Sequence, residues 1–594
     1  MVLNELERTV LSEVSREEAW RHVEWFTAAG EKLSGTPANE KSVDYVLKSL
    51  DGYGVRATAP EFQAWLDFPH LFDTQMKVTF PFEKTIEAMA LAQIASTSAD
   101  GIEAELIYVG GGGLADYAGK NANGKIVMVD FDRPPARPWK NYVAGMLKGA
   151  IGLVVIDYPA PVRVFNRGTV KSVWGNPTPD SVGEIGKIPC VNITQEDGAY
   201  LKGLLEKGPV KVWLKAFGER GWARTRQPNA SLGRGPEFVL LGSHMDAWGA
   251  AGSCNAVGVA STLETARVMS GHLPELRRGV ELLWFQGHET GIMTGSTWYV
   301  DTYWDWLRAG CAAYLNNDTP CMAGTTDYKV DCDPLLVDFV YDTVKELAEE
   351  DGLPIRPKKR YLPNKTGDQS FLGIGIPSVR VLTVFPEEIE KVTPGLGWWY
   401  HSDKDTLDKM DPDTLLAANR AQMLVILRLC TRPVVPYRVA EIARWATESL
   451  GDLAKRSGKA LDIMDLVEKA EKLREEAALL DEATAKLNER SSTGKGIKAE
   501  RLRPVNEGLL SISRSLAPVL YTLHGRYEQD HYGAEYIRPV PVLQPISELA
   551  SLNQDTPGYK ELRTKLVRAR NMVSDALGEA SWATRHTTEV ADKT

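Results

Sequence analysis

Cysteine is scarce in this chain. Only six occur among 594 residues, and they are scattered without a short repeating spacing. A small disulfide-stapled domain or a zinc ribbon would need such a spacing. We therefore expect six reduced thiols and a cytoplasmic location. The six are Cys190, Cys254, Cys311, Cys321, Cys332 and Cys430.

Long apolar runs and an excess of positive charge are also missing. No segment has the length of a membrane span, and the start, Met1–Arg8, has no basic stretch followed by an apolar one. We therefore expect neither a membrane anchor nor a signal peptide. The formal net charge of -10 argues against a general nucleic-acid binder, because phosphate contacts need clustered Lys and Arg.

The residues that are present are those of a large globular protein. Charged residues make up 25% and the apolar set 43%, close to ordinary proportions. A chain of 594 residues predicts several domains.

A short polar motif stands out against this background. His244-Met245-Asp246 follows the unbroken apolar run 238–243, which predicts a strand buried on both faces. In an open α/β sheet, such a strand delivers its last residues to the crevice where ligands bind. A carboxylate two residues after an imidazole is suited to orienting a metal-binding histidine, although an ordinary polar strand end remains an alternative.

The same arrangement recurs further along the chain. The apolar runs 279–285, 311–315 and 376–382 precede His288 and Glu289, Asp318, and His401. The chain has only nine His, and three of them follow such runs. Imidazoles and carboxylates gathered on one sheet edge predict a site for zinc or another divalent first-row metal.

An ordered series of motifs carries a family resemblance. The pieces are 242–248, 258–260, Glu289 with 295–298, 313–318, 375–378 and 400–402, and 31–40 adds a matching N-terminal piece. Together they resemble the co-catalytic zinc aminopeptidases, in particular the branch of glutamate carboxypeptidase II and the transferrin receptor. The resemblance implies an α/β fold, with a mixed sheet flanked by helices.

The resemblance also implies a role for each matched position. His244 and Asp318 would hold one metal ion, and Glu289 and His401 the other. Asp246 would be the partner that orients His244. The small peptides or related amides cleaved by such enzymes would be the substrates.

Two positions depart from the family pattern. Cys254 stands where the family has an Asp that bridges both ions, and His288 stands where it has the Glu that acts as general base. A carboxylate bridge partly neutralises two cations about 3.5–4 Å apart, and one sulfur cannot imitate its two-oxygen span. We therefore favour one tightly held ion, or a rearranged site that includes Cys254 or His288. His288 could still serve as a base, since its reference pKa is about 6.5.

Three functions follow from these residues. The first is a metal-dependent hydrolase of a peptide or related amide bond, which uses metal-activated water at an atypical, mononuclear or binuclear site. The second is a non-hydrolytic or non-catalytic family member that has kept the shape. The third is thiol chemistry at Cys254 with His288 as its activating base, against which a small buried hydrophobe is the plain alternative for Cys254.

The texture of the chain predicts three parts. Residues 1–60 and 221–432 would form the metallopeptidase-like domain. Residues 61–220, rich in strand-like runs, resemble the protease-associated domain inserted in this family, and a mere spacer is the alternative. Residues 433–594 carry amphipathic helical patterns and resemble the helical domain through which this branch forms homodimers, and packing on the catalytic core is the alternative.

Substrate contacts are expected near the last ligand. Trp399 and Tyr400 would form an apolar or aromatic wall beside the metal, or else be core residues. Asp368 would meet a substrate amine, which favours an aminopeptidase-like preference.

Overall fold

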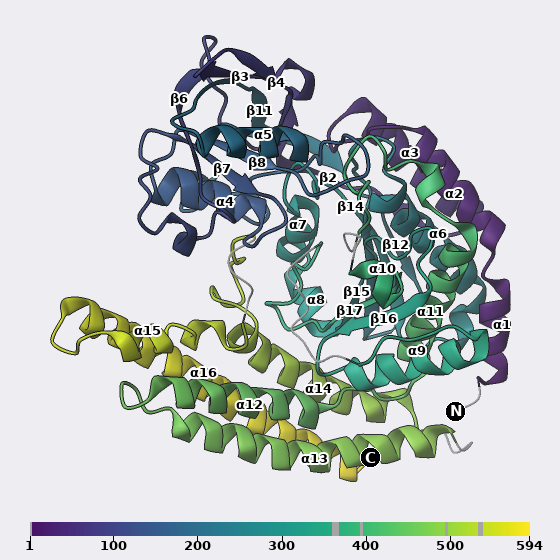
Figure 1. Cartoon of the computed structure of the whole chain (residues 1–594). Coiled ribbons are helices and arrows are strands. Elements are labelled where there is room, and N and C mark those ends of the chain that lie inside the picture. Colours follow the sequence, from purple (N-terminus) through teal and green to yellow (C-terminus); the bar gives the residue numbers. More distant parts are fainter. Residues whose placement is uncertain (1–2, 234, 359–366, 392–395, 493–496, 533–537) are drawn as a thin grey trace.

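The computed structural model describes residues 3–233, 235–358, 367–391, 396–492, 497–532 and 538–594. Figure 1 shows three regions: a mixed sheet between helices, a strand-rich region beside it, and a group of long helices beneath both. The expected α/β fold with a helical C-terminal region is confirmed by this architecture.

The central sheet has seven strands in the order β1-β12-β14-β13-β15-β17-β16. Its core is parallel, because β13 pairs in parallel with β14 and β15, and β15 with β17. The edge strands β1 and β16 run antiparallel to their neighbours, and β12, next to β1, runs antiparallel to β14. The bounds are β1 Ala57–Thr58, β12 Asn229–Leu232, β13 Phe238–His244, β14 Gly279–Phe285, β15 Cys311–Asn316, β16 Asp327–Cys332 and β17 Ser378–Val384.

Helices cover both faces of this sheet. Every residue of β13 is buried, as its unbroken apolar run predicts for a strand covered on both sides. The helix α6 lies directly against it and is itself buried at all positions but Arg267. The helices of this layer are α1 Glu5–Glu13, α2 Arg16–Ala28, α3 Pro37–Gly52, α6 Val257–Met269, α9 Val337–Asp351 and α11 Pro412–Thr431, and those of the other side are α7 Thr294–Thr302 and α8 Trp304–Gly310.

The strand-rich region has its own sheet and its own apolar core. The sheet has eight strands in the order β4-β3-β10-β6-β7-β8-β9-β5. A ribbon of β2 (Glu61–Pro69) and β11 (Gly218–Arg226) joins this region to the central sheet. The bounds are β3 Gln75–Phe80, β4 Lys84–Ile86, β5 Ala88–Ala90, β6 Ile102–Tyr108, β7 Ile126–Asp130, β8 Gly152–Ile156, β9 Cys190–Ile193 and β10 Lys211–Lys215, with helices α4 Arg137–Tyr142 and α5 Gln195–Leu205.

The C-terminal helices pack on one another and on the central domain. α13 lies against α12 and α16, and α14 lies against α16. Their apolar side chains join the same core cluster as the helices of the central sheet. The bounds are α12 Val439–Ser457, α13 Met464–Ser492, α14 Ala499–Leu520, α15 Ile546–Ser551 and α16 Pro557–Asp592, and the short α10 is Glu387–Glu390.

Between α14 and α15 the chain leaves the helices and rises toward the strand-rich region (Figure 1). Within this stretch, the Tyr532 backbone N–H donates to the Ser172 carbonyl at 2.7 Å. The Gln529 side-chain amide donates to the Ser370 carbonyl at 3.1 Å. Residues 521–532 therefore contact both other regions.

Within the described ranges, none of the helices combines the length and the apolar character that crossing a bilayer requires.

Candidate metal site

The expected ligands come from the carboxyl ends of the parallel strands. His244 is the last residue of β13, Glu289 and His288 follow β14, and Asp318 follows β15. A parallel sheet places such strand ends along one edge, so four residues separated by up to 74 positions meet there. His401 lies beyond β17, and Cys254 lies in the turn that leads into α6.

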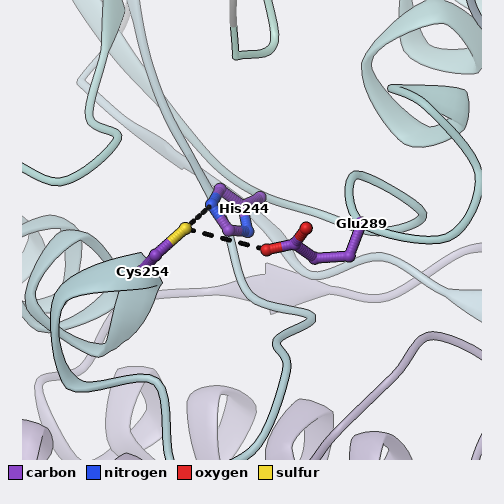
Figure 2. Close-up of side chains that lie close together, drawn as sticks. All are labelled: His244, Cys254 and Glu289. Carbon is purple, nitrogen blue, oxygen red and sulfur yellow. Dashed lines mark hydrogen bonds between the residues drawn. The ribbon is translucent and has the colours of Figure 1, made fainter. Parts of the chain in front are cut away.

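Glu289, His401 and Cys254 form one half of the site. His401 Nε2 lies 3.1 Å from Glu289 Oε1 and 3.3 Å from Cys254 Sγ. Cys254 Sγ lies 3.7 Å from Glu289 Oε1 and 3.5 Å from His244 Nε2, contacts drawn as dashed lines in Figure 2. The sulfur is therefore in contact with the imidazoles of His244 and His401 and with the Glu289 carboxylate.

His244, Asp318 and His288 form the other half. His244 Nε2 lies 3.6 Å from Asp318 Oδ1. The imidazole rings of His244 and His288 are stacked, with centroids 3.7 Å apart and an angle of 14° between the planes. One ligand atom from each of the three residues lies within 4.8 Å of the other two.

The pKa directions show a site with excess negative charge. Burial and the neighbouring His288 disfavour the cationic form of His244, yet Cys254 and Asp318 raise its pKa well above the ordinary range. Burial likewise opposes ionisation of Glu289, yet His401 lowers the pKa of this carboxyl to about 2. Imidazoles that gain protons despite complete burial indicate a pocket that attracts positive charge.

This donor set suits a divalent cation. It offers imidazole nitrogen, carboxylate oxygen and thiol sulfur, which are the ligand types of zinc. His244, Cys254 and Glu289 form a second group in which one ligand atom from each residue lies within 4.8 Å of the others. The residues present therefore fit the group that the resemblance implies, and the Cys254 sulfur is close enough to His244 and Glu289 to be one of its candidate ligands.

Asp246 has a different contact from the one expected. Its carboxylate accepts the backbone N–H groups of His288 at 3.2 Å and Glu289 at 3.0 Å. His244 Nδ1 instead lies 3.0 Å from the Asp246 carbonyl oxygen and 3.8 Å from the nearest carboxylate oxygen. The side chain of Asp246 thus orients the loop after β14, and its main chain orients His244.

Three further residues contact the candidate ligands or their loops, and the sequence did not predict these contacts. The Asp405 carboxylate accepts the backbone N–H groups of Ser253 at 2.8 Å and Cys254 at 3.2 Å. Trp248 Nε1–H donates to Glu289 Oε2 at 2.8 Å. The Arg167 carbonyl oxygen lies 3.1 Å from His401 Nδ1. Of these, Trp248 lies within the motif 242–248, but nothing in its residue type indicates this bond.

Asp368 is not placed as a free carboxylate facing a substrate amine. It is fully buried, and its Oδ2 lies 3.0 Å from His288 Nδ1. Burial alone would lower the pKa of His288, but the Asp368 charge raises it to about 10. Asp368 therefore acts on His288, over a sequence separation of 80 residues that no local pattern reveals.

Of the two aromatic residues, the structure places only Tyr400 at the ligands. The Tyr400 hydroxyl lies 3.8 Å from Cys254 Sγ, and its ring stacks on His401 with centroids 3.9 Å apart. Trp399 packs in the main apolar core, edge to face with Phe385. The core alternative thus describes Trp399, and the wall beside the ligands consists of Tyr400.

A buried lysine links the strand-rich region to the ligand loop. Lys171 is fully buried, and its Nζ donates to the carbonyl oxygens of Gly175 and, at 2.7 Å, Gly291. Gly291 follows Glu289 by two residues, in the loop that is one residue longer than the family pattern. Lys171 therefore fixes this loop from outside the central domain.

Comparison with known proteins agrees with this geometry. Residues 225–426 match the model of Peptidase family M28. The resemblance to zinc aminopeptidases and to the glutamate carboxypeptidase and transferrin receptor group is thereby confirmed for this region.

Individual relatives cover different shares of the chain. The probable lipoprotein aminopeptidase LpqL of Mycobacterium tuberculosis is 29% identical over 296 residues, which are 49% of this chain and 55% of that protein. The probable glutamate carboxypeptidase VP8 of Zea mays is 26% identical over 531 residues, 74% of this chain and 70% of that protein. A zinc aminopeptidase of Bacillus subtilis shares the fold with a TM-score of 0.54 and 19% identity, over 70% of this chain and 95% of that structure.

Proposed function

We propose that this protein is a metal-dependent hydrolase that cleaves a peptide or related amide bond. The observation that carries the proposal is the convergence of His244, Glu289, Asp318 and His401 on one sheet edge, within a region that matches Peptidase family M28. A divalent cation bound there, zinc in our proposal, would polarise the scissile carbonyl and make an attacking water more acidic.

The protein residues would position the reactants and move protons. His288 Nδ1 is held by Asp368, which leaves Nε2 as the atom that exchanges protons. Because the pKa of His288 is raised to about 10, well above the reference value of about 6.5 on which the expected base role relied, the cationic form is favoured near neutrality. In that form Nε2 would donate a proton to the leaving amine, and the neutral form that remains would accept one from an attacking water. The Tyr400 hydroxyl would contact the substrate beside Cys254.

The position of Cys254 bears on the number of ions that this site would hold. Cys254 Sγ touches the imidazoles of both halves, so one ion could share the sulfur with His244, Glu289 and His401. A second ion near Asp318 would lack the two-oxygen bridge that offsets repulsion between cations. We propose a single tightly held ion with Cys254 as a ligand.

A non-hydrolytic relative is the second candidate. It is favoured by the replacement of the family's bridging Asp and catalytic Glu by Cys254 and His288. It is disfavoured by the ligand residues that the chain retains and holds with buried hydrogen bonds, since a site without chemistry need not keep them.

Thiol chemistry with His288 as the activating base has less support. In the described part of the chain, the imidazoles in contact with Cys254 Sγ are those of His244 and His401. Burial also raises the pKa of the Cys254 thiol far above the range in which a thiolate forms unaided.

The decisive experiment joins metal content to turnover. We expect the purified protein to contain zinc and to cleave at least one member of a panel of aminoacyl amides, dipeptides and N-acyl amino acids, with inhibition by a chelator. His401→Ala should remove both metal and turnover, and His586→Ala, an exposed histidine on α16, should affect neither. Unchanged metal content in His401→Ala would refute the ligand assignment. Bound metal without turnover on any amide would favour the second candidate.

Three broader parts of the proposal rest on the same resemblance. Residues 61–220 would be a protease-associated-like domain that limits access to the site, and residues 433–594 would form a homodimer interface. The catalytic domain would comprise residues 1–60 and 221–432. The cytoplasmic location remains a prediction from the cysteine content.

A further inference from the structure

A second polar cavity lies at the junction of the central domain and the C-terminal helices. It has a volume of about 320 Å³. Three arginines line it, and they come from three different segments: Arg308 from α8, Arg514 from α14 and Arg526 from residues 521–532. Figure 1 shows α8 directly above α14 at this junction.

This cavity is separate from the metal site. α8 ends at Gly310, immediately before β15, whereas Asp318 follows the other end of that strand. Six strand residues span roughly 20 Å. The arginine cavity therefore lies at the opposite edge of the sheet from the candidate ligands.

The three arginines lack a carboxylate partner among the described residues. In the part of the chain that the structure describes, no ion pair joins any of them to a carboxylate. Arg514 Nε and one of its terminal nitrogens are buried without a hydrogen-bond partner. Arg308 donates to the Ile374 carbonyl at 3.3 Å, and its guanidinium lies 5.5 Å from the centroid of the Trp304 ring, so neither of these contacts supplies a negative charge. Unpaired buried donors of a cationic group are costly, so this arrangement favours an incoming acceptor.

Repulsion among the arginines points the same way. Burial, together with a smaller contribution from the nearby Arg308, lowers the pKa of Arg514 to about 10. Burial lowers the pKa of Arg308, with Arg526 as the next contributor. Two carboxylate residues, Asp305 and Glu579, also line the cavity, and both are exposed.

We propose that this cavity binds a small anion bearing phosphate or carboxylate groups. Guanidinium groups match the paired oxygens of both kinds of anion. The volume exceeds that of an isolated ion and lies at the lower end of small-molecule sites. A ligand bound there would connect α8, α14 and residues 521–532, and would therefore stabilise the contact between the central domain and the C-terminal helices.

Calorimetric titration of the full chain tests this proposal. The probes are glycerol 3-phosphate and tricarballylate, which bind divalent cations weakly, each at constant ionic strength with sodium chloride as the reference. We expect one anion per chain to bind, with Arg526→Gln weakening binding at least tenfold and Arg514→Gln weakening it further. Arg503 is an exposed arginine on α14, the helix of Arg514, and it pairs with Glu507. The control variant Arg503→Gln should leave the affinity unchanged.

The outcomes separate the two ligand sources. Binding of the phosphate ester alone would identify phosphorylated ligands, and binding of tricarballylate alone would identify carboxylates; either result, or both, supports the site. Arg526 lies on a half-buried loop position, so its variant decides the question if Arg514→Gln does not fold. No heat beyond that of sodium chloride, or equal affinities in the wild type and the Arg526 variant, would overturn the proposal.

Discussion

At the scale of single residues, the chemistry of this site depends on two substitutions relative to the family pattern. Cys254 Sγ contacts the candidate ligands His244, Glu289 and His401, at the position where the resembled family has a bridging carboxylate. The His288 ring stacks on that of His244, and its Nδ1 lies within hydrogen-bonding distance of the Asp368 carboxylate. Each substitution suggests a variant that changes one property of the site.

Cys254→Asp should increase the metal content of the protein. The introduced carboxylate offers two oxygens that can bridge cations and offset their repulsion. We expect elemental analysis to rise from about one ion per chain to about two, together with faster amide hydrolysis. Cys254→Ser, which removes the sulfur without adding a carboxylate, should not raise the metal content. An unchanged ratio in the Asp variant would contradict the bridging argument.

Asp368→Asn should reduce turnover by about 10- to 100-fold, the usual range for loss of a carboxylate that orients a catalytic or metal-binding imidazole. The amide keeps the shape but removes the charge that favours the present orientation of His288. Metal content, measured in the same samples, should stay near that of the wild type. A wild-type rate would show that the contact between Asp368 and His288 has no part in catalysis.

At the scale of secondary-structure elements, packing of α2 against its neighbours includes a buried histidine. His22 is fully buried, with Nδ1 2.8 Å from the Tyr45 hydroxyl and Nε2 2.7 Å from the Tyr53 hydroxyl. One hydroxyl donates to the neutral ring and the other accepts from it. Burial lowers the pKa of His22 from 6.5 to about 4.

This packing predicts a loss of stability in weak acid. Between pH 6.5 and 4 the unfolded chain binds a proton at His22 that the folded chain does not, so the free energy of unfolding falls as pH falls through this window. The loss should be about 2 kcal/mol at pH 5. His22→Gln should flatten this part of the curve in chemical unfolding experiments, and His586→Gln should not. Parallel pH profiles for wild type and His22→Gln would refute the assignment.

Element boundaries follow from the sequence more directly than side-chain contacts do. The apolar run before His244 predicts a strand, and β13 covers Phe238–His244 with every residue buried. By contrast, the bonds that Asp405 and Trp248 make to the ligand loops join residues 151 and 41 positions apart, respectively. Hydrophobic periodicity is a local pattern that predicts helices and strands. It carries no information about which distant polar group completes a buried hydrogen bond.

At the scale of the whole molecule, the C-terminal helices leave large apolar side chains in solvent. Trp582 on α16 is 63% exposed and Leu479 on α13 is 62% exposed. Exposed apolar groups of this size are common at interfaces between proteins. We propose that a homodimer formed through these helices covers the two side chains.

Light scattering at micromolar concentration should therefore give the mass of two chains, about twice 65.6 kDa. Trp582→Ser should weaken the dimer, because truncating an aromatic residue at an interface commonly costs more than about 1 kcal/mol of binding free energy. Trp222→Ser, an exposed tryptophan of β11, is the matched control. A monomeric mass for the wild type would end the dimer proposal.

The sequence by itself determined the kind of fold and the strand ends that carry the candidate ligands, because apolar runs and their polar termini are local properties of the chain. The tertiary structure alone decided which atoms meet. In the folded chain the Cys254 sulfur contacts the imidazoles of His244 and His401, and Asp368 contacts His288. Trp399 packs in the core, and three arginines line a cavity at a separate junction. These contacts depend on the packing of segments far apart in sequence. That packing decides whether a buried charged group meets a partner of opposite charge or a hydrogen-bonding group.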